Sequence, residues 1–219
     1  VFSTLDASLV AVRSSWAFED GHRRSVAGLL ETSLGVRPSG LQDAVEACWN
    51  RAFETHNDLL GPRDARHPAP VMALIVQRMV EATVAGVAFS ANPLTGATDE
   101  VHVNATWGLG TAVASDLVDP DVYILSRDGE ILHEAHAYKD QQYRVDPSGS
   151  GVAAFAVPAS QREGACMSPP VLRELATHIC AVADAFGYPV DVEWAIDGHG
   201  LHLLQARPIT AYGRRPTLQ

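Results

Sequence analysis

The stretch that decides the fold is Val190-Asp-Val-Glu-Trp-Ala-Ile-Asp-Gly-His-Gly-Leu-His-Leu-Leu-Gln-Ala-Arg207. It is typical of two strands joined by a short turn. We predict a three-residue loop, Gly198-His199-Gly200, because only the register that this loop gives separates the polar side chains from the apolar ones. Gly200 would supply the left-handed residue that such a loop needs.

This register places Glu193 opposite Gln205. Two residues further along, Asp191 lies opposite Arg207. The other face collects the apolar side chains of the hairpin, together with one histidine: Val192, Trp194, Ile196, Leu204, Ala206 and His202. Carboxylate and amide oxygens suit Mg²⁺, which shares its ligands with phosphates, and a guanidinium binds phosphate oxygens directly. The polar face is therefore either a magnesium and phosphate site or a plain cross-strand pairing on an exposed sheet.

Apolar periodicity predicts the elements around the hairpin. Strands are expected at 9–12, 71–80, 85–91, 101–105, 121–125 and 130–134, and a helix at 41–53. A second helix begins after its cap, Ser168, and ends at Gly187. Its buried stripe is expected to be Leu172, Leu175, Ile179, Val182 and Phe186. Residues 146–164 are predicted to be a connection. Strands and helices follow no βαβ rhythm, so we expect an α+β fold, with a mixed or antiparallel sheet and flanking helices.

The composition excludes several classes of function. Of 219 residues, 47% are hydrophobic and 19% are charged, which is typical of a folded globular chain, and the net charge is -10. Such an acidic chain argues against a nucleic-acid or anionic-membrane partner. No apolar run approaches the length of a membrane span. Three separated cysteines without a disulfide framework indicate a reducing, cytoplasmic location, and we expect Cys48 and Cys180 to be buried.

Three further segments carry possible phosphate chemistry. Arg13 follows an apolar strand and precedes two serines, so it is either a fork-like phosphate contact or a surface ion pair. Residues 27–32, with Gly28, and residues 107–110, with Gly108 and Gly110, could bring backbone N–H groups to phosphates. Each could equally be an ordinary turn. Zinc-binding and Walker-type spacings are absent from the sequence.

Five motifs in order resemble one family. They are Val10-Ala-Val-Arg-Ser-Ser15, Val76-Gln-Arg-Met-Val80, Gly86-Val-Ala-Phe-Ser-Ala-Asn-Pro93, Trp107-Gly-Leu-Gly110 and the closing segment from Asp191 to Thr210. Together they look like the ATP-binding (ATP-grasp) domain of phosphoenolpyruvate synthase, pyruvate phosphate dikinase and rifampicin phosphotransferase. The resemblance extends from about Leu9 to Thr210.

The resemblance implies ATP and Mg²⁺ as cofactors. Arg13 and Arg207 would be the catalytic cations on the phosphates, and Glu193 and Gln205 would bind Mg²⁺. The rest of the nucleotide site would consist of Gly28, Leu29, Thr32, Gln77, Met79 and Val80. Enzymes of this kind split ATP into AMP and phosphate. The β-phosphoryl group passes to a histidine on a separate swivelling domain, and an acceptor-binding domain receives it.

The match to the family also has gaps. Nothing corresponds to the family's earlier lobe and its phosphate lysine, so we expect residues 1–219 to be one partial ATP-grasp domain. Within it, 1–70 would be the end of the first lobe and a linker, and 71–210 the nucleotide-binding lobe. The chain alone is then expected to be inactive, with the other domains on the missing part of the polypeptide or on another chain.

Local departures keep a second function open. Thr111 stands where the family usually has an acid, and Asp116 where it has a glycine. The alternative is therefore a nucleotide-binding regulatory module or pseudoenzyme without turnover. An ATP-grasp ligase shares the fold but not these motifs, and it would release ADP rather than AMP.

Overall fold

The computed structural model describes residues 1–16, 32–60, 72–147 and 151–209. The chain divides into two compact units. The first consists of Val1–Met79 with Val145–Ala153, and the second of Val80–Arg144 with Ala154–Gln219. The expected division into lobes near residue 70 remains a prediction. The α+β fold class is confirmed, because helices accompany antiparallel sheets in both units.

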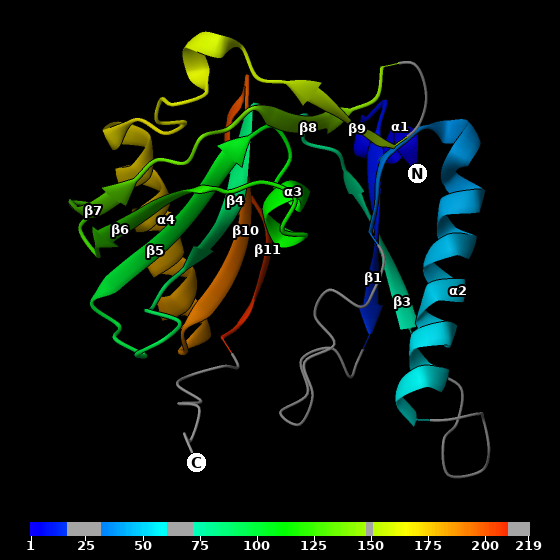
Figure 1. The fold of residues 1–219 in the computed structure, drawn as a ribbon. Coiled ribbons are helices and arrows are strands. Elements are labelled where there is room, and N and C mark those ends of the chain that lie inside the picture. Colours follow the sequence, from blue (N-terminus) through cyan, green and yellow to red (C-terminus); the bar gives the residue numbers. More distant parts are fainter. Residues whose placement is uncertain (17–31, 61–71, 148–150, 210–219) are drawn as a thin grey trace, which may run out of the picture. The chain divides into compact units, whose positions relative to one another are not determined.

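The first unit is a small antiparallel sheet packed against one long helix. Its elements are α1 (Phe2–Leu5), β1 (Val10–Trp16), β2 (Thr32–Val36), η1 (Pro38–Gly40), α2 (Leu41–Leu60) and β3 (Met72–Arg78). The strands are ordered β2-β1-β3. Val10 and Val12 are fully buried in a core with Cys48 of α2. The helix continues beyond its predicted end at residue 53, and Figure 1 shows it running beside β1 and β3.

The second unit is built on a larger sheet in the order β11-β10-β4-β5-β6-β7. Its strands are β4 (Val84–Phe89), β5 (Glu100–Trp107), β6 (Asp121–Ser126), β7 (Ile131–Ala135), β10 (Val190–Asp197) and β11 (Gly200–Pro208). Every neighbouring pair is antiparallel. The helices are the short α3 (Thr111–Ala114) and α4 (Pro169–Phe186). Figure 1 shows α4 lying along one face of this sheet.

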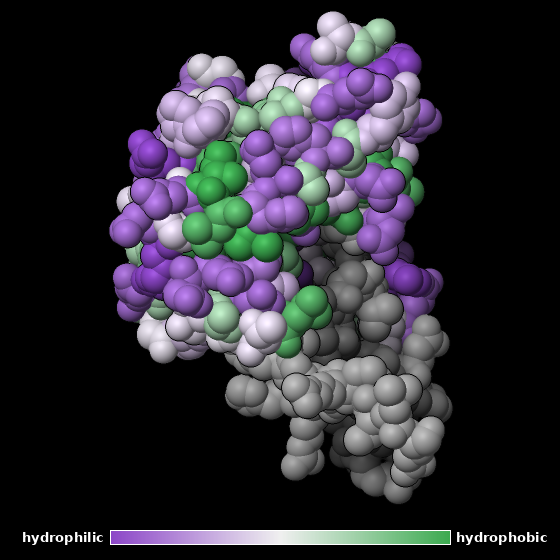
Figure 2. All heavy atoms as spheres, turned by 60° about the vertical axis from the view of Figure 1, so that its left-hand side comes forward, coloured by the Kyte–Doolittle hydropathy of each residue, from purple (hydrophilic) through white to green (hydrophobic). Residues whose placement is uncertain are grey.

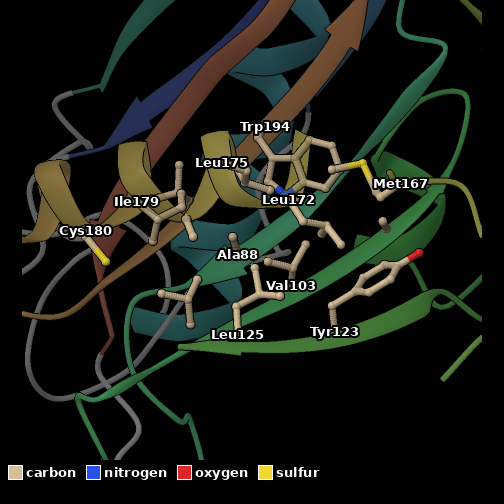
Figure 3. Close-up of a cluster of buried hydrophobic side chains, with 14 of the residues drawn as sticks. Ala88, Val103, Tyr123, Leu125, Met167, Leu172, Leu175, Ile179, Cys180 and Trp194 are labelled. Carbon is tan, nitrogen blue, oxygen red and sulfur yellow. The ribbon is translucent and has the colours of Figure 1, made fainter. Parts of the chain in front are cut away.

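The core of the second unit lies between α4 and that sheet face. Leu172, Leu175 and Ile179 of α4 point toward Trp194 and Leu125 of the strands (Figure 3), and all five side chains are fully buried. Gly187 ends the helix with φ 74°, as predicted. The expected place of Phe186 in the buried stripe is wrong, because 51% of it is exposed beside Tyr188, which is 42% exposed. At the last turn of the helix the apolar stripe runs beyond the edge of the core.

The segment 146–164 contains structure that was not predicted. It holds β9 (Val152–Ala156), which pairs with β8 (Gln141–Val145), and then η2 (Ala159–Gln161). We call β8 and β9 the ribbon. The ribbon spans the division of the chain, since 141–144 and 154–156 are grouped with the second unit and 145–153 with the first. Small residues masked the strand, because Ala153, Ala154 and Ala156 carry little alternation in hydropathy.

The described surface agrees with the acidic composition. On the side of the molecule seen in Figure 2, hydrophilic side chains dominate and hydrophobic ones gather in a small area. The three cysteines are buried and unpaired, as expected for Cys48 and Cys180. Within the described residues, no helix combines the length and apolar character that crossing a membrane requires.

Candidate functional site

The hairpin brings the predicted polar residues together. Glu193 pairs with Gln205, and Asp191 pairs with Arg207, in the antiparallel ladder of β10 and β11. Directly opposed residues of such a ladder project from the same face. Gly200 has the expected positive φ, at 128°. The predicted register is therefore correct at the positions on which the site depends.

The route to that register differs from the prediction. The turn has two residues, because Asp197 pairs with Gly200, and the backbone N–H of His199 donates to Asp197 Oδ1 over 2.7 Å. A bulge then shifts the register, so that Trp194 pairs with Leu203 while Glu193 still pairs with Gln205. The additional residue is Leu204, on β11. An extra residue in the strand thus has the effect that was expected from an extra residue in the loop.

The bulge also corrects the predicted position of His202. This residue pairs with Ala195 rather than lying on the side of Trp194, and its Nε2 is 2.9 Å from Asp197 Oδ1. It therefore shares the face of Glu193. Leu204 is the bulged residue, at which the register of β11 shifts, and it is not among the described residues packed against the core, so its predicted core position is wrong.

The polar face of the hairpin is the face that α4 leaves uncovered. Val192 and Trp194 point into the core under α4 and are fully buried. Asp191 and Glu193 alternate with them along β10, so they project from the face opposite α4. Phe89 and Val87 of β4 pair with these two carboxylates and extend the same face. The site of the second unit is thus placed by strand alternation alone.

Asp191 is the residue to which the sequence interpretation gave a position but no role. Its Oδ2 accepts a hydrogen bond from Arg207 Nε over 3.0 Å. Burial raises the pKa of Asp191, Arg207 opposes that rise, and the charge of Glu193 adds to it. Among the described atoms, Asp191 Oδ1 is buried and has no hydrogen-bond partner. A buried acceptor of this kind is costly unless a donor or a cation reaches it.

In the first unit, three predicted residues also share one face. Arg13 lies opposite Thr32 of β2 and opposite Ile75 of β3, and Gln77 pairs with Ala11. Val10 and Val12 point toward α2, so the alternate positions Ala11 and Arg13 point away from it. Arg13, Thr32 and Gln77 therefore project from the helix-free face of this sheet. No local spacing links them, because they come from strands far apart in the sequence.

The remaining predicted residues lie elsewhere. Gly28 and Leu29 fall outside the described residues. Met79 follows β3, and its N–H donates to Leu9 O over 3.1 Å. Met79 is the last residue of its segment in the first unit and Val80 is the first residue of the second. Both side chains are half-buried.

The donors on the hairpin fit a magnesium ion that shares its ligands with phosphates. Glu193 offers a carboxylate, Gln205 an amide oxygen, and Asp191 an unpartnered buried oxygen. Among the described residues, no group of three or more His, Cys, Asp or Glu side chains could hold a metal ion by itself. Proteins often bind Mg²⁺ through one or two side chains plus substrate oxygens and water.

The turn at residues 107–110 is tightly built. Gly108 has φ 78°, and its N–H donates to Thr83 O over 2.8 Å. Thr111, which stands in place of the family's acid, begins α3. Asp116 has a left-handed φ of 52°, a conformation that glycine adopts freely and that aspartate tolerates better than most residues. The exchange of glycine for Asp116 is thus accommodated by the backbone.

Two polar sheet faces, one opposite α2 with Arg13 and Gln77 and the other opposite α4 with Glu193, Gln205 and Arg207, are the features of an α+β nucleotide-binding domain. The comparison with protein families agrees. The family described as "Pyruvate phosphate dikinase, AMP/ATP-binding domain" matches residues 2–218. The chain belongs to this family, and the resemblance recognised in its motifs is confirmed.

Individual relatives support the assignment and show how much longer they are. The chain is 35% identical over 204 residues to the uncharacterized phosphotransferase YvkC of Bacillus subtilis, covering 92% of this chain and 24% of the relative. It is 34% identical to a rifampicin phosphotransferase of a Streptomyces species, covering 94% and 24%. With the phosphoenolpyruvate synthase of Pyrococcus furiosus it shares 31% identity, covering 96% and 27%. The chain thus spans about a quarter of the length of these relatives.

Proposed function

We propose that this chain is the ATP-binding component of a phosphotransferase that splits ATP into AMP and phosphate, using Mg²⁺. The β-phosphoryl group of ATP would pass to a histidine on a separate domain. The observation that carries the proposal is the paired row of Glu193 with Gln205 and Asp191 with Arg207 on the sheet face opposite α4. Membership of an AMP/ATP-binding family and relatives named as phosphotransferases and phosphoenolpyruvate synthases support it.

The residues would divide the work by charge. Glu193 and Gln205 would hold Mg²⁺, which supplies positive charge to the phosphate oxygens when bound. Asp191 accepts a hydrogen bond from Arg207 Nε, which would orient the guanidinium toward an anion. Arg13 would contact the phosphates from the first unit, with Thr32 and Gln77 on the same face. Gly28, Leu29, Met79 and Val80 would complete the nucleotide site. In phosphoryl transfer such groups mainly position the reactants and offset their charge.

The partners in this proposal lie outside the chain. A swivelling phosphohistidine domain and an acceptor-binding domain would be supplied by the rest of the polypeptide or by another chain, in keeping with the greater length of the relatives. A cytoplasmic location fits three buried, unpaired cysteines. Thr111 keeps a regulatory module without turnover as the second candidate, because it opens α3 where the family's acid would stand.

The central test is the metal dependence of nucleotide binding. Glu193→Ala should weaken Mg-ATP by about tenfold or more, since it removes a charged ligand, and should change the affinity for metal-free ATP much less. Isothermal titration calorimetry with and without EDTA measures both affinities. Glu130→Ala, an exposed glutamate of the same unit, is the matched control and should change neither. An equal loss with both ligands would make Glu193 structural.

A second assay addresses turnover. The chain alone, with ATP and Mg²⁺, should release no AMP and phosphorylate no acceptor. It would offer the phosphates fewer preorganised contacts than the chain together with its accompanying domains. Adding the domains that accompany this chain in its natural polypeptide or complex should produce AMP. Efficient AMP release by the lone chain would contradict the proposed division of labour, and release of ADP would indicate a ligase.

A further inference from the structure

A buried ion pair lies away from the polar face of the hairpin. Lys139 and Asp121 belong to the second unit, their side chains form an ion pair, and both are 0% exposed. Burying two charges is costly unless their remaining hydrogen-bonding positions are satisfied. Asp121 Oδ1 also accepts the Ala137 N–H over 3.0 Å, and Lys139 Nζ also donates to Ala137 O over 2.9 Å. The pair is thus embedded in a dense network.

The network joins three separate segments. Asp121 is the first residue of β6, Ala137 and Lys139 lead into the ribbon, and Cys166 lies on the chain that leaves it. Asp121 Oδ2 accepts the Cys166 N–H over 2.9 Å and the Tyr123 hydroxyl over 3.3 Å. One carboxylate therefore holds together the segment that enters the ribbon and the segment that leaves it. We call this region the base of the ribbon.

The base of the ribbon in turn holds the turn at residues 107–110. The Leu109 N–H donates to Tyr143 O over 2.8 Å. Trp107 Nε1 donates to Gln161 O over 3.3 Å, on the segment that leaves the ribbon. The approach is so close that a Cβ on Gly108 would lie 2.3 Å from Tyr143 O. Besides the bond from the Gly108 N–H to Thr83 O, two supports of the turn thus belong to segments tied to Asp121.

Further backbone bonds stiffen the same base. The Lys139 N–H donates to Arg162 O, and the Val157 N–H donates to Asp140 O, each over 2.9 Å. Arg162 Nε donates to Val157 O over 2.9 Å. A shift of Lys139 would thus be passed to both strands of the ribbon, because these bonds connect the two strands just where they begin and end.

We propose that Asp121 and Lys139 are positioning residues, which hold the base of the ribbon and through it set the turn at 107–110 and the start of α3. α3 packs against β4, which neighbours β10 in the sheet, and against β5, the strand beyond it. The pair touches no part of the candidate site itself. An effect of the turn on nucleotide binding rests on the proposed function. The support of the turn by Asp121 and Lys139 does not.

The charge balance of the pair provides a distinctive signature. Burial acts to raise the pKa of Asp121, but hydrogen bonds from Lys139 and Cys166 outweigh it, and the pKa lies below its ordinary value. The titratable groups that face Asp121 are Lys139, Tyr123 and Cys166, with His136 stacked on Tyr123 at 5.9 Å. Without Lys139, burial would dominate and the pKa of Asp121 would lie above its ordinary value.

The test uses Lys139→Met, which removes the charge and keeps most of the side-chain volume. Amide hydrogen exchange of the whole chain reports each backbone bond. We expect protection of the Leu109 amide to fall by about tenfold or more at neutral pH, because the base of the ribbon opens locally. Arg127→Met is the matched control. It breaks the exposed Arg127–Asp184 ion pair of the same unit and should change Leu109 protection less than about twofold.

The pH dependence distinguishes a role that depends on the charge of Lys139 from one that depends only on the volume of its side chain. In Lys139→Met the folded state binds a proton on Asp121 more readily than the unfolded state does. Stability and Leu109 protection should therefore recover as the pH falls through the raised pKa. In the wild type the pKa of Asp121 is lowered, so acidification through it reduces stability instead. A loss in Lys139→Met that does not change with pH would overturn the proposal.

A second variant covers a failure to fold. Asp121→Asn with Lys139→Met removes both charges, so it should fold, while one of the two backbone N–H groups on Asp121 loses its acceptor. Leu109 protection should still be reduced, and wild-type protection in this variant would overturn the proposal. Where the wild type binds Mg-ATP, both variants should bind it more weakly. A wild type that does not bind Mg-ATP refutes the proposed function and leaves the exchange result to decide the positioning role.

Discussion

Each unit carries one polar sheet face, which we call its half-site, and the two are built in opposite ways. In the second unit, Glu193, Gln205 and Arg207 lie on one hairpin, so a local register decides their arrangement. In the first unit, Arg13, Thr32 and Gln77 come from three strands, and only the assembled sheet brings them to one face. The hairpin could therefore be interpreted from spacing, whereas the first half-site needed the resemblance to a family. A local site tolerates changes elsewhere in its unit better than a site assembled from distant strands.

The largest expected effect concerns the two cores that support these half-sites. Leu175 and Val12 are both fully buried, one under each sheet. Leu175→Ala should lower the free energy of unfolding of the second unit by about 2–5 kcal/mol, and Val12→Ala that of the first by about 1.5–3 kcal/mol. Urea-dependent hydrogen exchange resolves the two units. If each variant weakens the amides of both units equally, the units unfold as one body and the contrast between them disappears.

The next effect sharpens the contrast between the half-sites in binding. Arg13→Ala should weaken ATP by about ten- to a hundredfold, because it removes a charged donor to phosphate. Unlike Glu193→Ala, it should do so equally with and without Mg²⁺. Calorimetry measures both affinities, and Arg51→Ala, on the exposed side of α2, is the control. A loss confined to Mg-ATP would place Arg13 with the metal rather than with the phosphates.

A smaller effect is expected at Asp191, where stability and binding should move in opposite directions. Its folded-state pKa is raised, so the wild type loses stability as the pH rises from the unfolded pKa through the folded one. Asp191→Asn should remove that loss, yet bind ATP about three- to tenfold more weakly, because Arg207 loses its charged partner. Urea unfolding between pH 3.5 and 7 and ATP titration measure the two sides. A variant that is less stable at every pH would show that the ion pair outweighs burial.

The smallest effect tests the backbone near α3. Asp116 has φ 52°, so Asp116→Gly should stabilise the chain by up to about 1 kcal/mol, after the entropy that glycine adds to the unfolded state. Thermal unfolding measures the change. Asp99→Gly, at an exposed position without a positive φ, should be neutral or destabilising. Stabilisation by both exchanges would remove backbone strain as the explanation.

Most strands, both long helices and the polar face of the hairpin could be predicted, because each depends on local periodicity, whereas β2 and the ribbon were not predicted. The bulge could not. An extra residue in the turn and an extra residue in the strand give the same pairing of Glu193 with Gln205, and adjacent Leu203 and Leu204 leave the choice open. The side chain of Asp197, which supports the short turn, decides it. The same ambiguity misplaced His202.

Residues joined through distant segments were beyond prediction for a different reason. Lys139 follows Asp121 by 18 positions and lies outside any predicted strand, so no pattern connects the two. The ribbon was missed because its alanine-rich second strand lacks contrast between its faces. For the same reason of distance, Thr32 and Gln77 could be assigned only through the resemblance, while their common face with Arg13 became visible in the sheet.

The interrupted first unit has a consequence for the order in which the chain is made. Residues 1–79 leave the ribosome well before 145–153, which complete the same unit, so a further 74 residues, 80–153, must be made before the unit is complete. At typical bacterial and eukaryotic elongation rates this is a wait of about 4–15 s. During that time Gly151 has not yet been made. In the folded unit it lies so close to Gly35 that a Cβ added to Gly35 would be 2.7 Å from the Gly151 carbonyl oxygen. The second unit begins to emerge meanwhile, so a nascent chain paused before residue 153 would carry a first unit that is still open at β2.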